Sequence, residues 1–173
     1  MLDAILNRRS IRFFRSDPVS DADVEEVLKA GFCAPSAHGA APWHVVVVKD
    51  PEVKARLAAV HRWARFIERA PVSIVVCVER GETGHFWVED GAVFMENMMI
   101  QATSMGLGSC WISIRGVVDG DVDAEVEVRK VCGLPDHFGV AAIMPLGYAA
   151  RHPGPHEPAL PEGRVHHDSY SQG

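Results

Sequence analysis

The chain has 173 residues, a hydrophobic fraction of 47% and a formal net charge of −6. This length predicts one domain, residues 1–173, long enough to bury about 70% of the surface that the unfolded chain exposes. The acidic balance argues against a general binder of nucleic acids or anionic membranes, since both need a broad basic face, so a local basic cluster indicates one small anion.

The first part of the chain predicts two helices. Apolar residues within the first six positions give a short amphipathic helix that ends near Arg9. Ser20 is a predicted helix N-cap with Asp23 at the capping-box position. The second helix therefore begins at Ser20, and we expect it to close near Gly31.

The middle of the chain predicts two strands and two more helices. The β-branched run at 43–49 indicates a strand covered on both faces, and Asp50-Pro51 begins a helix with proline at its first position. A second buried strand is predicted at 72–78. Residues 88–105 are apolar nearly all round, which indicates a central buried helix, and Gly106 is placed to end it in a left-handed conformation.

The last predicted elements are a strand at 109–114, a helix within 119–133 that stops at Gly133, and a strand at 140–148. Pro145 lacks an N–H group, so we expect it at a bulge or a sheet edge. Strands interleaved with helices predict a layered α/β or α+β sandwich.

Residues 149–173 carry four prolines and show neither a helical nor a strand period. Such a long irregular stretch is unusual inside a compact domain. It is either a disordered tail or a segment laid along another subunit. In the second case the anchoring side chains are expected to be Leu160, Val165 and Tyr170.

Four cysteines lie in apolar contexts without any C-x-x-C pair, as is typical of buried reduced thiols. They are Cys33, Cys77, Cys110 and Cys132. No histidine or cysteine spacing predicts a metal site. No apolar run reaches the ~20 residues that a membrane span needs, and the amino terminus lacks a signal-peptide pattern, so we expect a cytoplasmic protein.

Three connecting stretches carry the candidate chemistry. In NRRSIRFF, residues 7–14, three arginines and a serine hydroxyl are suited to grip a phosphate, although the same cluster also complements a helix C-terminus. In CAPSAHGAAPWH, residues 33–44, small residues let the backbone approach a flat ligand. In GLGSCWIS, residues 106–113, backbone N–H groups can reach ring heteroatoms, although this is not a dinucleotide fingerprint.

These stretches, in this order, resemble the FMN-dependent nitroreductase family. NRRSIRFF resembles the family's R-R-S-x-R-x-F opening, and APSAHGAAPWHVVVV resembles its A-P-S-x-x-N-x-Q-P-W segment. MENMMIQATSMGLGSCWIS resembles its central helix and the G-L-G-[ST]-C-W-I-G motif that follows. MPLGY and LPEGRVHHDSY resemble its closing strand and tail, so the resemblance covers nearly the whole chain.

The resemblance implies an α+β fold, which is a three-layer sandwich with a mixed central β-sheet flanked by helices. It also implies a homodimer with FMN at the subunit interface. The C-terminal arm, about residues 149–173, would be exchanged between the subunits. An arm of this kind would give the proline-rich tail a role.

Three groups of residues are implied to hold FMN. Its phosphate and its ribityl or pyrimidine end would contact Arg8, Arg9, Ser10 and Arg12. The flavin would be lined from the other subunit by Pro35, Ser36 and Ala37. Backbone near flavin N5 would come from Trp111, Ile112 and Ser113.

By the same resemblance the chain is an NAD(P)H-dependent FMN oxidoreductase. Electrons would pass from NAD(P)H through flavin N5 to nitroaromatic, quinone or similar electron-poor acceptors by a ping-pong mechanism, without a catalytic nucleophile. Two alternatives stay open: another flavin chemistry, such as reductive dehalogenation or flavin breakdown, and a flavin-binding or FMN-less dimer without turnover. The short segment 79–88 leaves little room for a lid, which favours a generalist reductase.

The chain departs from the family pattern at four positions. Gly39 and Ala41 stand where the family usually has Asn and Gln side chains, and Glu157 and Ala159 stand where it often has basic residues. We expect the amino-terminal arginines to suffice for the phosphate. The alternatives are weak FMN binding or a substitute, which would be His156 or Arg164.

Two further residues of the 33–44 loop have a reactive side chain. Cys33 ends an apolar helix, so we expect it to be packed rather than catalytic. His38 is expected to be a loop or substrate-pocket residue.

Overall fold

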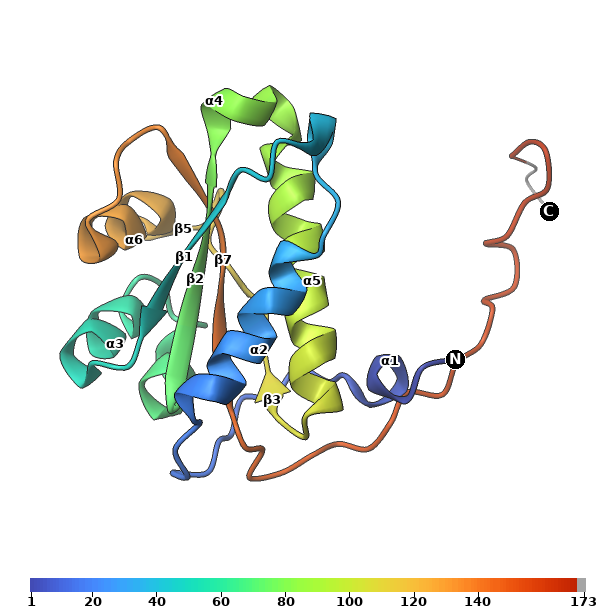
Figure 1. Cartoon of the computed structure of the whole chain (residues 1–173), viewed down its shortest axis with the longest axis horizontal. Helices are drawn as coiled ribbons and strands as arrows, with labels where there is room; N and C mark the ends of the chain where they lie inside the picture. The colour runs from blue at the N-terminus through green and yellow to red at the C-terminus, as the bar shows by residue number, and fades with distance from the viewer. Residues whose placement is uncertain (171–173) are drawn as a thin grey trace.

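The computed structural model describes residues 1–170, and its body consists of three layers (Figure 1). A five-stranded sheet forms the middle layer in the order β1-β2-β7-β3, with β4 also pairing with β7. The strands are β1 (Trp43–Val48), β2 (Val72–Glu79), β3 (Gly108–Ser109), β4 (Ile112–Ser113) and β7 (Phe138–Gly147). This arrangement confirms the α+β sandwich.

All pairings between these five strands are antiparallel. The resemblance implied a mixed sheet. Within residues 1–170, parallel pairing is limited to an isolated bridge between Ser10 and Ser109. That bridge joins the arginine-rich segment to the β3 edge of the sheet.

Helices α2 (Asp21–Phe32) and α5 (Trp87–Ser104) cover one face of the sheet (Figure 1). The predicted cap of α2 is confirmed, because the N–H of Asp23 donates to Ser20 Oγ at 3.0 Å. The predicted end near Gly31 is also confirmed, because α2 ends at Phe32 and Gly31 is its penultimate residue. A Cβ at this position would lie 2.7 Å from the Phe94 ring, so the glycine lets α2 approach α5 closely.

Helices α3 (Pro51–Ala58) and α6 (Ala124–Cys132), with the short helix η2 (Arg65–Arg69), cover the other face. Between the two layers, every residue of β2 from 72 to 78 is buried. Ile74 and Val76 enter the α2–α5 core, while Val75 and Cys77 enter the α3–α6 core, because successive strand side chains point to opposite faces. The predicted buried strand is confirmed. The central helix is confirmed in place, but α5 is buried on one side only, since Val93 and Glu96 are exposed.

Strand β1 occupies the predicted residues, but the prediction that it is covered on both faces is wrong. His44 and Val47 are exposed, and Val45 and Val46 are only partly buried. The cause is its position, because β1 is an edge strand and α5 packs mainly over β2 and β7.

The predicted strand at 109–114 is broken into β3 and β4. Both pieces keep the same register on β7, with Ser109 opposite Leu146 and Ile112 opposite Ile143. That register places Pro145 at the interruption, where a residue without an N–H cannot donate a ladder hydrogen bond. Pro145 therefore lies in the central strand β7 rather than at the bulge or sheet edge that we expected, and the neighbouring strand is broken instead.

The predicted helix within 119–133 begins later than expected. Strands β5 (Val118–Asp119) and β6 (Val122–Asp123) first form a small hairpin, and α6 follows. The Asp123 carboxylate caps α6 by accepting from the N–H groups of Glu125 and Val126 at 2.9 and 3.1 Å. The predicted stop at Gly133 is confirmed, with a left-handed φ of 66°.

Four short helices complete the elements of the described chain. They are α1 (Asp3–Asn7), η1 (Ala37–Gly39), α4 (Arg80–Thr83) and η3 (Gly84–Phe86). None of the helices in residues 1–170 is both long and apolar enough to pass through a membrane.

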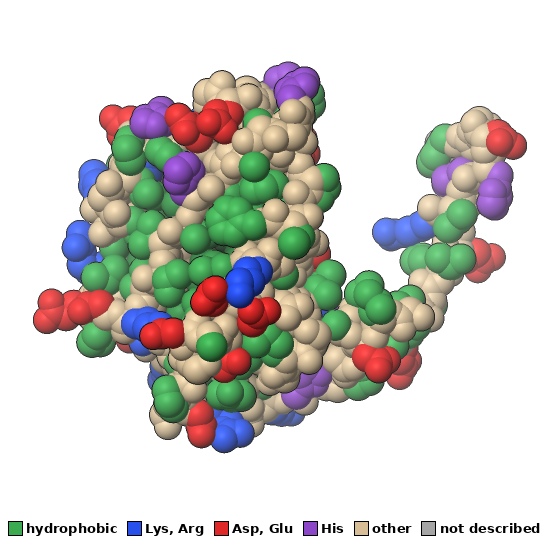
Figure 2. Space-filling model, viewed as in Figure 1, with side chains coloured by type: hydrophobic (Ala, Val, Ile, Leu, Met, Phe, Trp, Pro, Cys, Tyr) green, Lys and Arg blue, Asp and Glu red, His purple; other side chains and the backbone are tan. Residues whose placement is uncertain are grey.

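The segment after Ala150 has no helix or strand up to residue 170, and it extends away from the body (Figures 1 and 2). Its beginning docks on the C-terminal end of α1. The N–H of His156 donates to Leu6 O at 2.7 Å, and ring nitrogens of His152 and His156 lie 2.9 Å from the carbonyl oxygens of Asn7 and Arg8. These are carbonyls that a helix leaves without intrahelical partners.

Exchange of the arm between subunits thus stays a prediction for the residues beyond His156. Figure 2 shows hydrophobic side chains along this part of the tail. The three expected anchors are all exposed here: Leu160, Val165 and Tyr170.

Candidate functional site

The arginine-rich segment lies directly after α1 and lines a pocket of about 470 Å³. Ile11 anchors the segment, because its side chain is buried and its N–H donates to Ser109 O at 2.8 Å. Gly108 permits this contact, since a Cβ there would lie 2.8 Å from the Ile11 side chain. The pocket is lined by Arg8, Arg9, Ser10, Ile11, Arg12, Phe13, Arg151, Pro153 and His156.

This pocket gathers four guanidinium groups and has no carboxylate among its lining residues. Arg12 and Arg151 form no ion pair within residues 1–170, and the carboxylate of the exposed Glu96 lies 3.7 Å from Arg8 Nε. Arg9 is used differently, since its Nη1 donates to the carbonyl of Gly154 at 2.8 Å. The site therefore concentrates positive charge with little internal compensation.

A second pocket, of about 420 Å³, adjoins the first and shares Arg12 with it. Its wall is mostly apolar and aromatic. The lining residues are Arg12, His61, Trp63, Phe66, Cys110, Trp111, Ile112, Ser113 and Val117. Burial raises the pKa of Cys110, although the nearby Arg12 guanidinium opposes that shift, so the residue is a thiol at neutral pH.

Two of the three predicted residue groups thus meet on one side of the molecule. The amino-terminal group of arginines and Ser10 lines the basic pocket, and the 111–113 group lines the apolar one. They converge because β3 and β4 pair with the same strand, β7, and Ser10 bridges to Ser109 of β3.

The third predicted group, Pro35 to Ala37, lies elsewhere. Its loop leads into β1, at the edge of the sheet opposite β3. Three strand spacings separate the two edges, which is about 14 Å. Within one chain this group therefore does not form part of either pocket.

The loop that carries this third group is held by two side chains. The N–H of Ala37 donates to Asp90 Oδ1 at 2.8 Å, and Asp90 is only 4% exposed. The N–H of Ala41 donates to Ser36 Oγ at 2.9 Å. Both Gly39 and Ala41 have positive φ, so the two positions that depart from the family pattern shape a tight turn.

The expectation for Cys33 is wrong, because this residue is exposed. It is the C-cap of α2, and its neighbour Ala34 packs against the core instead. His38 is exposed in the loop, with its ring edge-on to Phe86 at 6.3 Å. All four cysteines are free, and burial raises the pKa of Cys77 to about 12.

The tail residues fall into two groups around the basic pocket. His156 lines it, whereas Glu157, Ala159 and Arg164 are exposed and do not. Glu157 therefore does not bring a negative charge into the pocket. Within residues 1–170 there is also no cluster of three or more His, Cys, Asp or Glu residues suited to a metal ion.

The sequence motifs do not mark six of the lining residues: Arg151 and Pro153 of the basic pocket, and His61, Trp63, Phe66 and Val117 of the apolar one. For His61, Trp63 and Phe66 the available signal is the basic and aromatic run HRWARF at 61–66. No local period marks it as part of a site, because these residues reach the pocket only when the α3 side of the sheet folds against β4.

Known proteins resemble this chain over nearly its whole length. The model of the nitroreductase family matches residues 5–64 and 59–148. A protein of Methanothermobacter thermautotrophicus, named an NADH dehydrogenase/NAD(P)H nitroreductase, is 33% identical over 96% of this chain and 85% of its own length. The FMN reductase (NADPH) of Bacillus subtilis is 29% identical over 97% of this chain and 73% of its own length.

Solved structures show the same fold. The FMN-dependent nitroreductase of Clostridium difficile R20291 superposes with a TM-score of 0.93 at 28% identity. The superposition covers 98% of this chain and all of that protein.

Proposed function

The chain belongs to the nitroreductase family, and on that premise we propose that it is an FMN oxidoreductase which uses NAD(P)H to reduce nitroaromatic, quinone or similar electron-poor acceptors. Relatives named for FMN and for NAD(P)H support the general activity. The electron acceptors and the ping-pong mechanism are the parts of the proposal that go beyond what the names of these relatives state.

One observation carries the assignment of the site, namely a basic pocket without a lining carboxylate beside an apolar pocket, with Arg12 common to both. A phosphate monoester carries a charge of about −1.5 to −2 at pH 7, which guanidinium groups bind through charge-assisted hydrogen bonds. The donor set therefore fits the phosphate of FMN, and the adjoining apolar walls fit a flat ring system.

The residue roles follow from this placement. Arg8, Arg12 and Ser10 would hold the phosphate and ribityl end, with Arg151 as an additional cation from the tail. Arg9 would contribute less directly, because it already binds the tail carbonyl of Gly154. Trp111 to Ser113 would present their backbone to the ring end.

The proposal includes a homodimer with FMN at the subunit interface. Pro35 to Ala37 lie at the opposite sheet edge from the basic pocket, so only a second subunit could bring them to the same flavin. Exposed hydrophobic residues also favour association. Leu2 before α1, Ile5 on α1 and Val93 on α5 are exposed. Figure 2 shows further hydrophobic side chains on the face formed by α2 and α5.

When bound, FMN supplies the redox chemistry, by accepting a hydride from NAD(P)H and returning electrons to the acceptor in a ping-pong cycle. The chain's own residues bind and orient the cofactor. Between β2 and α5 the chain forms only the short helices α4 and η3, so this segment supplies no long lid. An open site of this kind suits a generalist reductase.

The test starts from the purified protein, reconstituted with FMN. We expect a yellow protein whose flavin absorbance is bleached anaerobically by NADH or NADPH and restored by a nitroaromatic or a quinone. Initial rates at several acceptor concentrations should give parallel double-reciprocal lines, as ping-pong kinetics requires. Sedimentation of the holoprotein should give the mass of a dimer.

Two of the alternatives have outcomes of their own in this test. A colourless protein that cannot be reconstituted with FMN contradicts the cofactor assignment and favours a dimer without flavin. A protein that binds FMN and is bleached by NAD(P)H, but is reoxidised only by a halogenated aromatic substrate, favours dehalogenation.

A further inference from the structure

His61 is a buried histidine in the wall of the apolar pocket, outside all three residue groups that the family resemblance implies. It lies just after α3 and is 5% exposed. Its Nε2 lies 3.0 Å from the carbonyl oxygen of Ser113. A carbonyl oxygen only accepts hydrogen bonds, so Nε2 carries the proton and donates.

The other ring nitrogen of His61, Nδ1, is buried and has no hydrogen-bond partner in the part of the chain that the structure describes, so the contact of Nε2 is the one that anchors the ring. The Trp63 ring packs beside it, with the two ring centroids 5.8 Å apart. The imidazole is therefore oriented by aromatic packing on one side and by the Ser113 carbonyl on the other.

The Ser113 carbonyl belongs to a segment that the sheet supports only weakly. β4 has two residues, Ile112 and Ser113, and the ladder before it is interrupted opposite Pro145. After it the chain leaves the sheet for a turn at Gly116, which has a φ of 69°. The bond from His61 is thus an additional fixed point for this short segment.

Strand geometry links the Ser113 carbonyl to its N–H group. In an extended strand the N–H and the C=O of one residue point to the same side. The Ser113 N–H therefore points to the side on which His61 meets the carbonyl. Both residues line the apolar pocket, so this N–H is directed toward the space assigned to the flavin ring.

We propose that His61 is a positioning residue, whose Nε2–H fixes the backbone of Ser113 through its carbonyl and so holds the Ser113 N–H in place for the ring end of FMN. This inference rests on the proposed function, because it concerns the same pocket. It adds a residue from the α3 side of the sheet, which the motifs of the chain do not mark.

The consequence for the cofactor is a shift in redox potential. A fixed N–H donor stabilises the oxidised ring, which accepts a hydrogen bond at N5, over the reduced ring, which carries a proton there. Loss of the His61 contact should loosen this donor. The midpoint potential should then rise, because the oxidised form loses more binding free energy than the reduced form.

The experiment compares two substitutions of nearly equal size in the full-length protein reconstituted with FMN. In His61→Gln the amide nitrogen reaches the position of Nε2 and can donate to Ser113 O. In His61→Met the side chain has the same length and no donor. For each, the dissociation constant of FMN and the midpoint potential, measured by dye equilibration, are compared with those of the wild type.

We expect His61→Gln to keep the wild-type potential. His61→Met should weaken binding of oxidised FMN about tenfold relative to reduced FMN, which corresponds to a rise of about 30 mV for a two-electron couple. Should His61→Met fail to fold, His61→Asn replaces it, because its amide is too short to reach the Ser113 carbonyl.

The outcomes separate this inference from the proposed function. A wild-type protein that does not take up FMN overturns both. A wild-type protein that binds FMN, with His61→Met at the wild-type potential, overturns the role of His61 alone. A rise in potential shared by His61→Gln and His61→Met also overturns it, since the donor would then not be the cause.

Discussion

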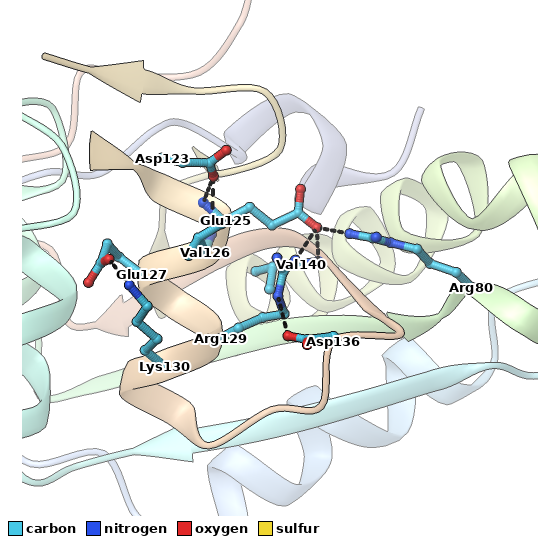
Figure 3. A network of polar contacts seen from close by, with 9 residues as sticks. All are labelled: Arg80, Asp123, Glu125, Val126, Glu127, Arg129, Lys130, Asp136 and Val140. Carbon is cyan, nitrogen blue, oxygen red and sulfur yellow. Dashed lines mark hydrogen bonds and ion pairs between the residues drawn. The ribbon is translucent and has the colours of Figure 1, made fainter. Parts of the chain in front are cut away.

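Two arginine clusters of this protein differ in how their charge is compensated. The first surrounds Glu125 on α6 (Figure 3). Its carboxylate accepts from Arg80 of α4, from Arg129 Nη1 at 3.1 Å, and from the N–H of Val140 at 3.3 Å. The second cluster lines the basic pocket, where no lining residue is a carboxylate.

The difference shows which positive charges serve the fold and which are free to serve a ligand. Glu125 joins three separate elements through one carboxylate, so that cluster is complete within the chain. In the basic pocket the guanidinium groups of Arg12 and Arg151 have no ion-pair partner within residues 1–170. Because like charges repel, such a cluster is most stable when an anion lies between them.

The largest expected effect comes from breaking the complete cluster. Glu125→Ala leaves two guanidinium groups and the Val140 N–H without their common acceptor, which should lower the free energy of unfolding by about 3 kcal/mol. Urea unfolding of the FMN-free protein measures this change. The matched control is Glu127→Ala on the same helix, which removes an exposed ion pair with Lys130 and should cost less than about 1 kcal/mol.

The two glutamates also test whether the clusters are independent. Glu125→Ala should leave the dissociation constant of FMN unchanged, because α6 does not line the basic pocket. If Glu125→Ala instead weakened FMN binding as strongly as it weakened folding, the division between a structural and a ligand-binding cluster would be incorrect.

The next effect in size concerns the incomplete cluster. Arg12→Ala should weaken FMN binding by about 1.5–3 kcal/mol, or about ten- to hundredfold, because it removes a charge-assisted contact. A fluorescence titration of the apoprotein with FMN measures the affinity. The matched control is Arg69→Ala on η2, an exposed arginine outside both pockets, which should bind FMN like the wild type.

Arg12→Ala should also affect FMN affinity and folding stability differently. Removing Arg12 relieves repulsion within the cluster, so the FMN-free protein should unfold at the same or a slightly higher urea concentration. Unchanged FMN affinity would remove Arg12 from the phosphate site.

The smallest effect concerns Arg62, which belongs to neither cluster. It lies next to the apolar pocket, and Asp119 already compensates its charge. Its Nε donates to Asp119 Oδ1 at 3.0 Å, and its guanidinium holds the pKa of Asp119 below its usual range. A lowered carboxyl pKa adds stability above the ordinary carboxyl value, and this contribution is lost as the pH falls through the lowered value. Arg62→Ala should therefore reduce the free energy of unfolding at pH 7. It should have no effect at a pH where Asp119 is protonated in both the folded and the unfolded state.

Thermal unfolding between pH 2 and pH 7 checks this dependence, with the difference between wild type and Arg62→Ala shrinking toward the acid end. FMN affinity should stay at the wild-type value throughout the range in which the protein is folded. A loss of FMN binding in Arg62→Ala would show that compensation by Asp119 does not keep Arg62 from the ligand.

The sequence by itself determined the elements whose cause is local. Ser20 and Asp50 cap helices through their own side chains, and Gly133 ends α6 in a left-handed conformation. The continuous apolar run of β2 could be read as a buried strand. The family motifs also indicated three residue groups, and the structure brings two of them together on one side of the molecule.

The tertiary structure alone decided the features that depend on a distant partner. Pro145 lies in the central strand because the adjacent ladder is interrupted opposite it, and Gly31 is needed where α2 meets Phe94. His61 and Arg151 reach their pockets from segments that carry no motif. The order of residues within a short segment determines the hydrogen bonds that form between positions a few residues apart. The contacts of Pro145, Gly31, His61 and Arg151 instead depend on how segments far apart in the chain pack together.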